Sequence, residues 1–253
     1  MHLDVQELRR FYYETQLGRA AQRRVRDKLV TLWPQMRGRT LVGFGFAVPL
    51  LRPFLDDARR VIGLMPAPQG VMAWPEGQPN RSVLCEDRRW PLPTGFVDRL
   101  VVMHGLETSE TPTALLQEAR RVLGPGGSVV FVVPNRAGLW ARSDQTPFGY
   151  GRPYSLPQIE AQLDQHGFAA GRHDVVLFQP PSHRRFWLRA GPVCERVGRR
   201  LSRRYAGGVL LVEAQVAAQR PGGTSVRETE RAPAPVFEGM PQPASGRTFR
   251  LRA

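Results

Sequence analysis

Two glycines and an alanine form the first group in this sequence whose types and spacing could do chemistry. Gly43, Gly45 and Ala47 follow an apolar strand, and Pro49 then opens a helix. Such a turn lets the backbone approach a ligand closely, and the helix N-terminus offers free N–H groups. The spacing lacks the full G-x-G-x-x-G pattern, which counts against a nicotinamide dinucleotide. A turn needed only for packing is the alternative.

A histidine at the end of a predicted strand is the best candidate for acid–base chemistry. His104 follows the apolar run 97–103, and open α/β sheets bind ligands at the carboxyl ends of their strands. His104 could take a proton from a bound molecule, or it could be a hydrogen-bonded cleft histidine without that role. Glu107 could orient the ring, although a solvated helix-cap role is the simpler expectation.

Strands and helices that alternate along the chain predict the sheet that positions these residues. Continuous apolar runs suit parallel strands that are covered on both faces. Their alternation with helices predicts an α/β fold with a doubly wound, mostly parallel, seven-stranded sheet. The predicted strands are 40–47, 60–65, 82–85, 97–103, 128–133, 173–178 and 208–216.

Capping signals predict the helix boundaries. Residues 4–7 (DVQE) form a capping box that opens an N-terminal helical leader over 1–37, which Gly18 divides into two helices. Pro112 begins the next long helix, and residues 155–158 (SLPQ) cap another.

The leader carries three side chains that could cover a ligand. Tyr12, Tyr13 and Thr15 lie together in its first half. They could form a lid over the cleft, but packing against the core is the stronger expectation, because a leader without strands must bury its apolar face on another element.

Three motifs follow the glycine turn in order: residues 90–93 (WPLP), 96–104 (FVDRLVVMH) and 118–130 (EARRVLGPGGSVV). They resemble those of the class I S-adenosylmethionine-dependent methyltransferases, in particular the type 11 group of small bacterial enzymes. The resemblance covers about residues 38–180. It implies a Rossmann-like methyltransferase domain over 38–218, with S-adenosyl-L-methionine as cofactor.

The resemblance also implies roles for individual residues. It assigns the cofactor to Gly43, Gly45, Ala47, Met65, Glu86, Asp87, Trp90 and Met103. The glycine turn would wrap the amino-acid part, an acid at 86 or 87 would contact the adenine amino group, and Trp90 could stack on the adenine. The family's usual acids before the turn and at the ribose are Leu41 and Met65 here, and a missing ribose carboxylate weakens discrimination for that sugar.

The loop over 135–154, after the fifth strand, is the predicted acceptor region. Aromatic and arginine side chains interleave there, which suits a planar or anionic molecule; an ordered surface loop is the alternative. The candidate substrate residues are Trp140, Arg142, Tyr150 and Arg152.

Charge is concentrated in one segment. The chain has 36 Lys and Arg against 22 Asp and Glu, a net charge of +14. Residues 182–204 hold eight arginines and one glutamate and carry half of that surplus. They predict a basic amphipathic helix inserted before the last strand, which could bind RNA, an anionic membrane surface, or only solvent. Residues 219–253 are rich in Pro, Gly and Ser and predict a disordered tail.

Composition excludes several other classes. Two cysteines and five unpaired histidines give neither a disulfide framework nor a metal-ligand spacing. No apolar run reaches the roughly 20 residues of a membrane helix, and charged residues interrupt the N-terminus where a signal peptide would need an apolar core. We expect a cytoplasmic protein without a metal.

The leading hypothesis is therefore a methyltransferase for a small-molecule or lipid-like acceptor. The alternative is a non-catalytic methyltransferase-like binding or regulatory protein, which Leu41 and Met65 favour. RNA methylation ranks behind both, because no base-reading motif accompanies the arginine segment. The methyl acceptor and the oligomeric state are open.

Overall fold

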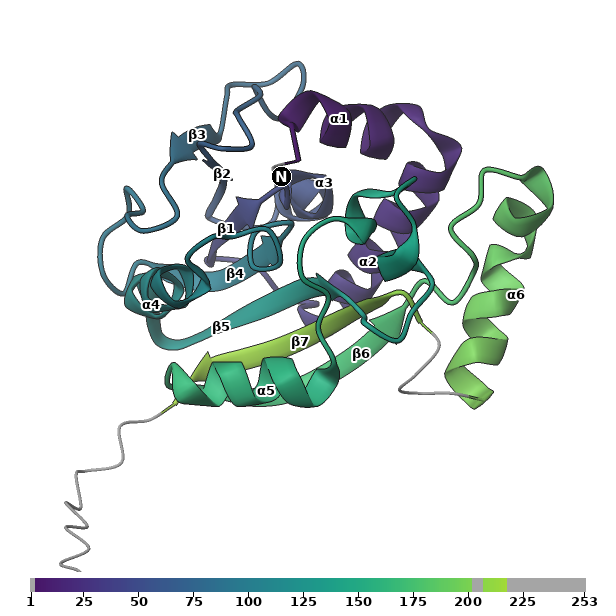
Figure 1. Cartoon of the computed structure of the whole chain (residues 1–253). Helices are drawn as coiled ribbons and strands as arrows, with labels where there is room; N and C mark the ends of the chain where they lie inside the picture. Colours follow the sequence, from purple (N-terminus) through teal and green to yellow (C-terminus); the bar gives the residue numbers. More distant parts are fainter. Residues whose placement is uncertain (1–2, 202–206, 218–253) are drawn as a thin grey trace, which may run out of the picture. The chain divides into compact units, whose positions relative to one another are not determined.

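One seven-stranded sheet organises the described residues, which are 3–201 and 207–217 in this computed structural model. The strand order is β3-β2-β1-β4-β5-β7-β6 (Figure 1). The strands are β1 (Thr40–Gly45), β2 (Arg60–Pro66), β3 (Ser82–Cys85), β4 (Val97–Met103), β5 (Leu123–Pro134), β6 (Phe168–Val176) and β7 (Val209–Val216). The predicted tail over 219–253 lies outside the described residues.

Strand direction confirms the doubly wound, mostly parallel sheet. β1 pairs in parallel with β2 and β4, so that Gly43 lies beside Gly63 on one side and Val101 on the other. β7 runs antiparallel between β5 and β6. The order in which strands are added to the sheet reverses between β1 and β4. Open α/β sheets bind ligands at such a point.

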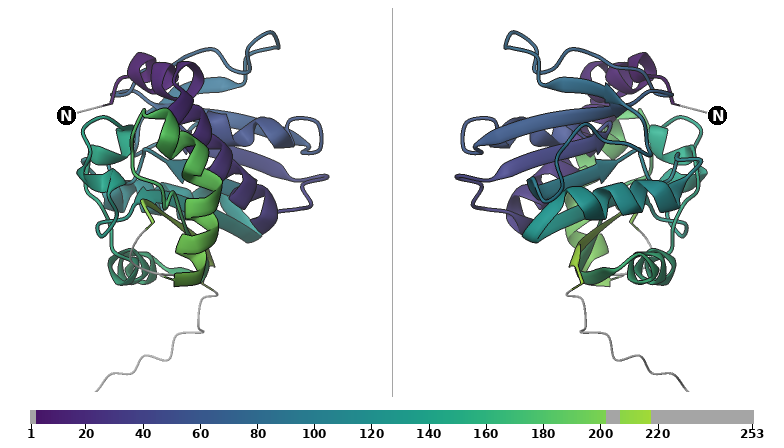
Figure 2. Two further views of the ribbon diagram at one scale, coloured as in Figure 1. Left: turned by 90° about the vertical axis from the view of Figure 1, so that its right-hand side faces the viewer. Right: turned by 90° about the vertical axis from the view of Figure 1, so that its left-hand side faces the viewer.

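Two apolar layers cover the sheet. The strands alternate their side chains, so Phe131 faces one layer and Val132 the other. The helices α4 (Pro112–Val122) and α5 (Leu156–Gln165) form the first layer. The leader and the short helix α3 (Val48–Leu51) form the second. Figure 2 shows α2 and α6 on one side of the sheet and α4 on the other.

The leader consists of α1 (Val5–Arg9), a π-helical turn (Arg10–Glu14) and α2 (Gln16–Leu32). The break falls at Thr15 and not at the predicted Gly18, because the Thr15 hydroxyl accepts a hydrogen bond from the Gly18 N–H and caps α2. Gly18 serves close packing instead, since a Cβ there would lie 1.9 Å from the Phe11 carbonyl oxygen. The leader shares one core with β1, β4, β5 and β7.

Local signals position most of the remaining elements. Pro112 begins α4, and the Ser155–Gln158 capping box begins α5, as predicted. β5 starts at Leu123, five residues before its predicted start, because the chain continues extended through the Pro-Gly-Gly turn. β6 is also displaced from the prediction and covers 168–176. The arginine segment forms α6 (Arg185–Leu201).

Glu118 on α4 fixes the segment before β4. Its carboxylate accepts hydrogen bonds from the Arg121 guanidinium at 2.7 Å and from the Trp90 N–H at 2.7 Å. The hydrogen bond from Arg121 lowers the pKa of Glu118 most, and the hydrogen bond from Trp90 lowers it further. Partial burial acts in the opposite direction but is outweighed.

This pKa predicts a specific acid sensitivity. Because the folded pKa lies below the unfolded one, the contribution of Glu118 is present above the unfolded pKa and is lost as the pH falls through the folded pKa. Glu118→Gln should lower the free energy of unfolding by about 1–2 kcal/mol at neutral pH, and urea denaturation should show this difference shrinking at acid pH. The exposed Glu76→Gln is the control; a loss for Glu118→Gln that does not depend on pH would contradict the assignment.

Candidate functional site

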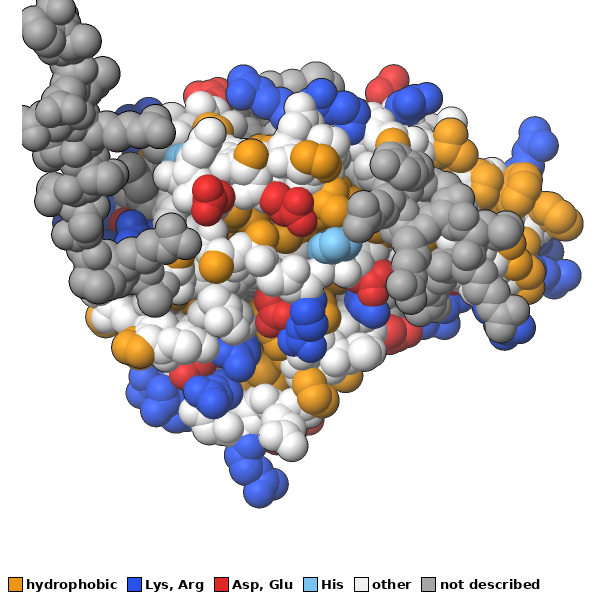
Figure 3. All heavy atoms as spheres, turned by 90° about the horizontal axis from the view of Figure 1, so that it is seen from below, with side chains coloured by type: hydrophobic (Ala, Val, Ile, Leu, Met, Phe, Trp, Pro, Cys, Tyr) orange, Lys and Arg blue, Asp and Glu red, His pale blue; other side chains and the backbone are white. Residues whose placement is uncertain are grey.

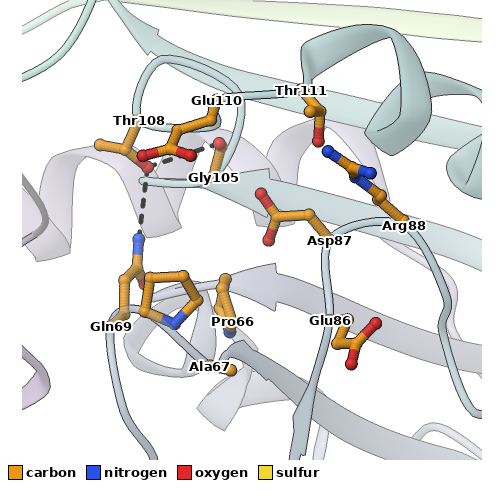
Figure 4. Close-up of a pocket in the computed structure, with 11 residues that line it drawn as sticks. Pro66, Ala67, Gln69, Glu86, Asp87, Arg88, Gly105, Thr108, Glu110 and Thr111 are labelled. Atoms are coloured by element: carbon orange, nitrogen blue, oxygen red, sulfur yellow. Dashed lines mark hydrogen bonds between the residues drawn. The ribbon is translucent and has the colours of Figure 1, made fainter.

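A cavity of about 270 Å³ lies at the carboxyl ends of β2, β3 and β4. Its lining residues are Pro66, Ala67, Pro68, Gln69, Glu86, Asp87, Arg88, Gly105, Thr108, Glu110 and Thr111. Figure 4 shows the Asp87 carboxylate and the Gln69 amide pointing into this space, while Arg88 extends toward Thr111. The cavity therefore occupies the edge of the sheet where the topology predicts a ligand site.

The cavity wall is acidic on the side of β3. Asp87 accepts a hydrogen bond from the Ser109 hydroxyl at 2.8 Å. Burial, and then the charges of Asp87, Glu118 and Glu86, raise the pKa of the Cys85 thiol to about 12. Cys85 is therefore protonated at neutral pH and is no nucleophile. Glu86 and Asp87, which line the cavity, suit a ligand that donates hydrogen bonds, such as an amino group.

A buried hydrogen-bonded chain lies beside the cavity at the end of β4. The Tyr12 hydroxyl is 2.6 Å from Nε2 of His104, and Nδ1 of His104 is 3.0 Å from Oε1 of Glu107. All three residues are almost completely buried. Glu107 thus orients the histidine and is not the solvated cap that the simpler expectation describes.

The two hydrogen-bond partners of His104 determine which of its ring nitrogens carries the proton. Burial, and then the negative charge of Glu107, raise the pKa of Tyr12 well above its ordinary value, so its hydroxyl keeps its proton. Tyr12 therefore donates to Nε2, and Nδ1 donates to the Glu107 carboxylate. His104 also has a positive φ of 52°, a backbone conformation that is uncommon outside glycine and clusters at functional sites. Its carbonyl oxygen accepts a hydrogen bond from the Gln69 amide.

The glycine turn lies beneath this chain and is itself buried. Tyr12 stacks on Phe46, the residue between Gly45 and Ala47, at 5.8 Å between ring centres. A Cβ at Gly43 would lie 2.8 Å from the Leu51 side chain and 2.9 Å from Cβ of Ala47. Gly43, Gly45 and Ala47 are thus near His104, but they do not line the cavity.

The other positions assigned to the cofactor divide into two groups. Glu86 and Asp87 line the cavity. Met65 and Met103 are buried in the core on the leader side of the sheet, and the Met65 sulfur accepts a hydrogen bond from the Met72 N–H at 3.4 Å. Trp90 packs in the opposite layer, stacked on Phe44 at 4.5 Å, and is not part of the cavity lining.

The acceptor loop holds buried aromatics and exposed arginines. Trp140 is fully buried, and its indole N–H donates to the Gln179 carbonyl at 2.7 Å. Phe148 contacts the His104 ring at 4.7 Å between centres. Arg142 and Arg152 are exposed, and the Arg152 backbone N–H donates to the Glu107 carbonyl at 2.8 Å. The loop therefore supports the His104 network through its backbone and its aromatic rings.

Tyr150 lines a second cavity, of about 250 Å³, between the leader and this loop. The lining residues are Leu3, Glu7, Arg10, Phe11, Thr15, Asp144, Gln145, Thr146, Pro147, Tyr150 and His183. The Thr146 hydroxyl is buried there without a hydrogen-bond partner. The leader lines this second cavity, and its Tyr12 is buried against His104.

Sequence reasoning does not identify Gln69 and Thr108 as part of the site. The Gln69 amide donates to the Thr108 hydroxyl at 3.4 Å, and the Gln69 carbonyl accepts from the Val5 N–H at 2.7 Å. No motif marks either residue, because their positions depend on how the leader packs. In the part of the chain that the structure describes, no group of three or more His, Cys, Asp or Glu residues could hold a metal ion.

Comparison with known proteins finds a methyltransferase domain in the first half of the sheet. Residues 41–131 match the family model described as a methyltransferase domain. This segment includes β1 to β4, α4 and the first part of β5. The match supports a class I S-adenosylmethionine-dependent methyltransferase domain over these residues, and the strand order agrees with the Rossmann-like fold of that class. Comparison with curated proteins gives no significant match.

Solved structures share the fold at low sequence identity. An S-adenosylmethionine-dependent methyltransferase of Thermotoga maritima is 18% identical, with a TM-score of 0.55 over 84% of this chain and 96% of its own. One from Aquifex aeolicus is 16% identical, with a TM-score of 0.54 over 85% and 100%. The [4+2]-cyclase SpnF is 20% identical, with a TM-score of 0.54 over 79% and 82%.

Proposed function

We propose that the chain binds S-adenosylmethionine and transfers its methyl group to a small-molecule or lipid-like acceptor. The observation that carries the proposal is the acidic cavity at the ends of β2, β3 and β4, which adjoins the buried His104 network. The methyltransferase domain match over 41–131 supports the same reading.

The adenosyl half of the cofactor fits the cavity. Glu86 and Asp87 offer acceptors for the adenine amino group, and Gly105 lines the cavity at the end of β4. A volume of about 270 Å³ is at the lower limit of ligand pockets, which begin near 300 Å³. The amino-acid half would need the glycine turn, which Tyr12 and Phe46 now cover. Full binding therefore requires Tyr12 to withdraw.

The chemistry asked of the protein is then mostly positioning. The bound cofactor supplies a methyl group on a sulfonium, which is already a good leaving group. When the Tyr12 hydroxyl leaves Nε2 of His104, that nitrogen becomes free to accept a proton from an acceptor, while Glu107 keeps Nδ1 protonated and the ring in place. The second cavity, with Tyr150 and Thr146, is the proposed acceptor site.

A non-catalytic binding protein on the same fold is the second candidate. The buried Leu41 and Met65 favour it, because apolar residues occupy places where the resemblance implies carboxylates. The cyclase SpnF illustrates that a protein with this fold can carry another activity. The arginines of α6 whose side chains the structure describes lie outside both cavity linings, so they give RNA methylation no support at the site.

Calorimetric titration with S-adenosylhomocysteine tests the proposal. We expect the intact chain to bind with a dissociation constant below about 1 mM. Ala67→Trp, which fills the cavity from an exposed position, should weaken binding by at least about tenfold, since it excludes the adenosyl group.

The matched control is Ala161→Trp on the exposed face of α5, which should bind like the parent chain. No heat at millimolar ligand, or equal binding by both tryptophan variants, would sink the assignment of the cavity to the cofactor. Binding without methyl transfer to any acceptor would favour the second candidate.

A further inference from the structure

The helix α6 presents an apolar stripe to solvent. Phe186 is 69% exposed, Val193 57% and Val197 45%. Their spacing of seven and four positions places them on one face of the helix. Figure 3 shows hydrophobic and basic side chains gathered over α6 at one edge of the molecule. Large apolar side chains grouped on a surface mark an interaction site.

Arginines accompany the stripe. Arg184, Arg185, Arg189 and Arg196 are exposed along the same helix and just before it. The segment 182–204 has a net charge of +7 from eight arginines and one glutamate. Its glutamate, Glu195, is buried. Among the side chains that the structure describes, the outward face of α6 therefore combines exposed arginines with an apolar stripe.

The opposite face of α6 contacts the domain. The Glu195 carboxylate accepts a hydrogen bond from the Phe178 N–H at 3.0 Å. Gly191 and Gly198 let the helix approach closely, because a Cβ at either would lie 2.0 Å from the Gln179 amide or 2.3 Å from the Phe178 ring. The exposed side chains are thus held in place without a partner from the described part of this domain.

We propose that α6 docks the chain on an anionic membrane surface. Phe186, Val193 and Val197 would enter the boundary between headgroups and acyl chains, and the arginines would contact lipid phosphates. None of the helices described here combines the length and apolarity needed to cross a bilayer, so the contact is interfacial. This proposal stands apart from the methyl-transfer assignment.

An anionic lipid surface explains the stripe better than RNA does. RNA binding rests on charge and on base stacking, and the outward face offers one exposed aromatic with two valines. Aliphatic side chains at the centre of a cationic face are the pattern of helices that lie in a membrane interface.

Docking would also bring the second cavity to the membrane. His183 lines that cavity and comes two residues before α6 begins. An acceptor held in the bilayer surface would then have a short path to Tyr150. This consequence rests on the proposed function, whereas the docking itself does not.

Sedimentation of the full chain with lipid vesicles tests the proposal. We expect binding to vesicles of phosphatidylcholine that contain about one third phosphatidylglycerol, and at least roughly tenfold weaker binding to phosphatidylcholine alone. Phe186→Ser should weaken binding to the anionic vesicles about tenfold. Arg189→Glu and Arg196→Glu should each weaken it about fivefold or more.

Exposed residues on other elements supply the controls. Val71→Ser and Arg23→Glu, the latter on α2, should bind like the parent chain. Thermal unfolding of each variant checks that it is folded. Equal binding to neutral and anionic vesicles, binding that is unchanged in Phe186→Ser, or tight binding to single-stranded RNA without vesicle binding would each overturn the proposal.

Discussion

Gly45→Ala should lower the free energy of unfolding by about 3–5 kcal/mol, one of the two largest effects that we expect from a single substitution. Gly45 has a φ of 79°, and a Cβ there would lie 2.2 Å from the Met103 carbonyl oxygen. The same carbonyl accepts the Phe46 N–H at 2.8 Å. The backbone therefore cannot move away without losing the end of the β1–β4 pairing.

Gly38→Ala separates the two causes of this loss. Gly38 has a φ of 74°, but no atom lies within 4 Å of its Cβ position. It should lose only about 1 kcal/mol, which is the cost of the left-handed backbone alone. Urea denaturation measures both variants, and equal losses would show that the turn is not closely packed against β4.

His104→Ala should destabilise the protein by about 3–5 kcal/mol at neutral pH. The substitution removes the ring that joins Tyr12 to Glu107, and it leaves a buried carboxylate without its hydrogen-bond donor. The other carboxylate oxygen of Glu107 is already buried without a partner. The damage comes mainly from the stranded charge and not from the missing ring.

A double-mutant cycle identifies this cause. In the variant that also carries Glu107→Gln, the stranded charge is gone, so the combined loss should be at least about 1 kcal/mol smaller than the sum of the two single losses. His166→Ala is the control, because His166 is only partly buried and bonds to the Gln162 carbonyl within its own helix; it should lose less than about 1 kcal/mol. Additive losses at 104 and 107 would contradict the buried pair.

Much of the fold could be predicted because its signals are local. Apolar runs identify the strands, and the Ser155 capping box and Pro112 mark helix starts within a few residues of sequence. The boundaries that differ depend on the finished structure, because the Thr15 hydroxyl caps α2 and the chain stays extended from Leu123 through the Pro-Gly-Gly turn.

The site could be predicted only in part, because it depends on contacts between distant segments. His104 could be found at the end of a strand, but Tyr12 is 92 positions away and reaches it only through the packing of the leader. The π-helical turn at 10–14, which carries Tyr12, has no sequence signature of its own. Likewise, composition does not reveal that Trp90 stacks on Phe44.

The order of the chain therefore predicts which edge of the sheet holds the site, and the leader determines how that site is closed. Glu86 and Asp87 follow β3 in sequence and remain at the cavity. The glycine turn begins in the last residues of β1, and Tyr12 of the leader stacks on its Phe46. The proposal accordingly assigns the adenosyl half of the cofactor to a formed cavity and the amino-acid half to a place that the leader must vacate.

A crystal structure of the full chain grown with saturating S-adenosylhomocysteine tests this central claim most directly. We predict the adenine in the cavity beside Asp87 and Gly105, with the Tyr12 hydroxyl moved away from Nε2 of His104 and the amino-acid part against the glycine turn. A ligand bound outside this cavity, or an unchanged Tyr12–His104 hydrogen bond with no ligand at the ends of β2, β3 and β4, would contradict it.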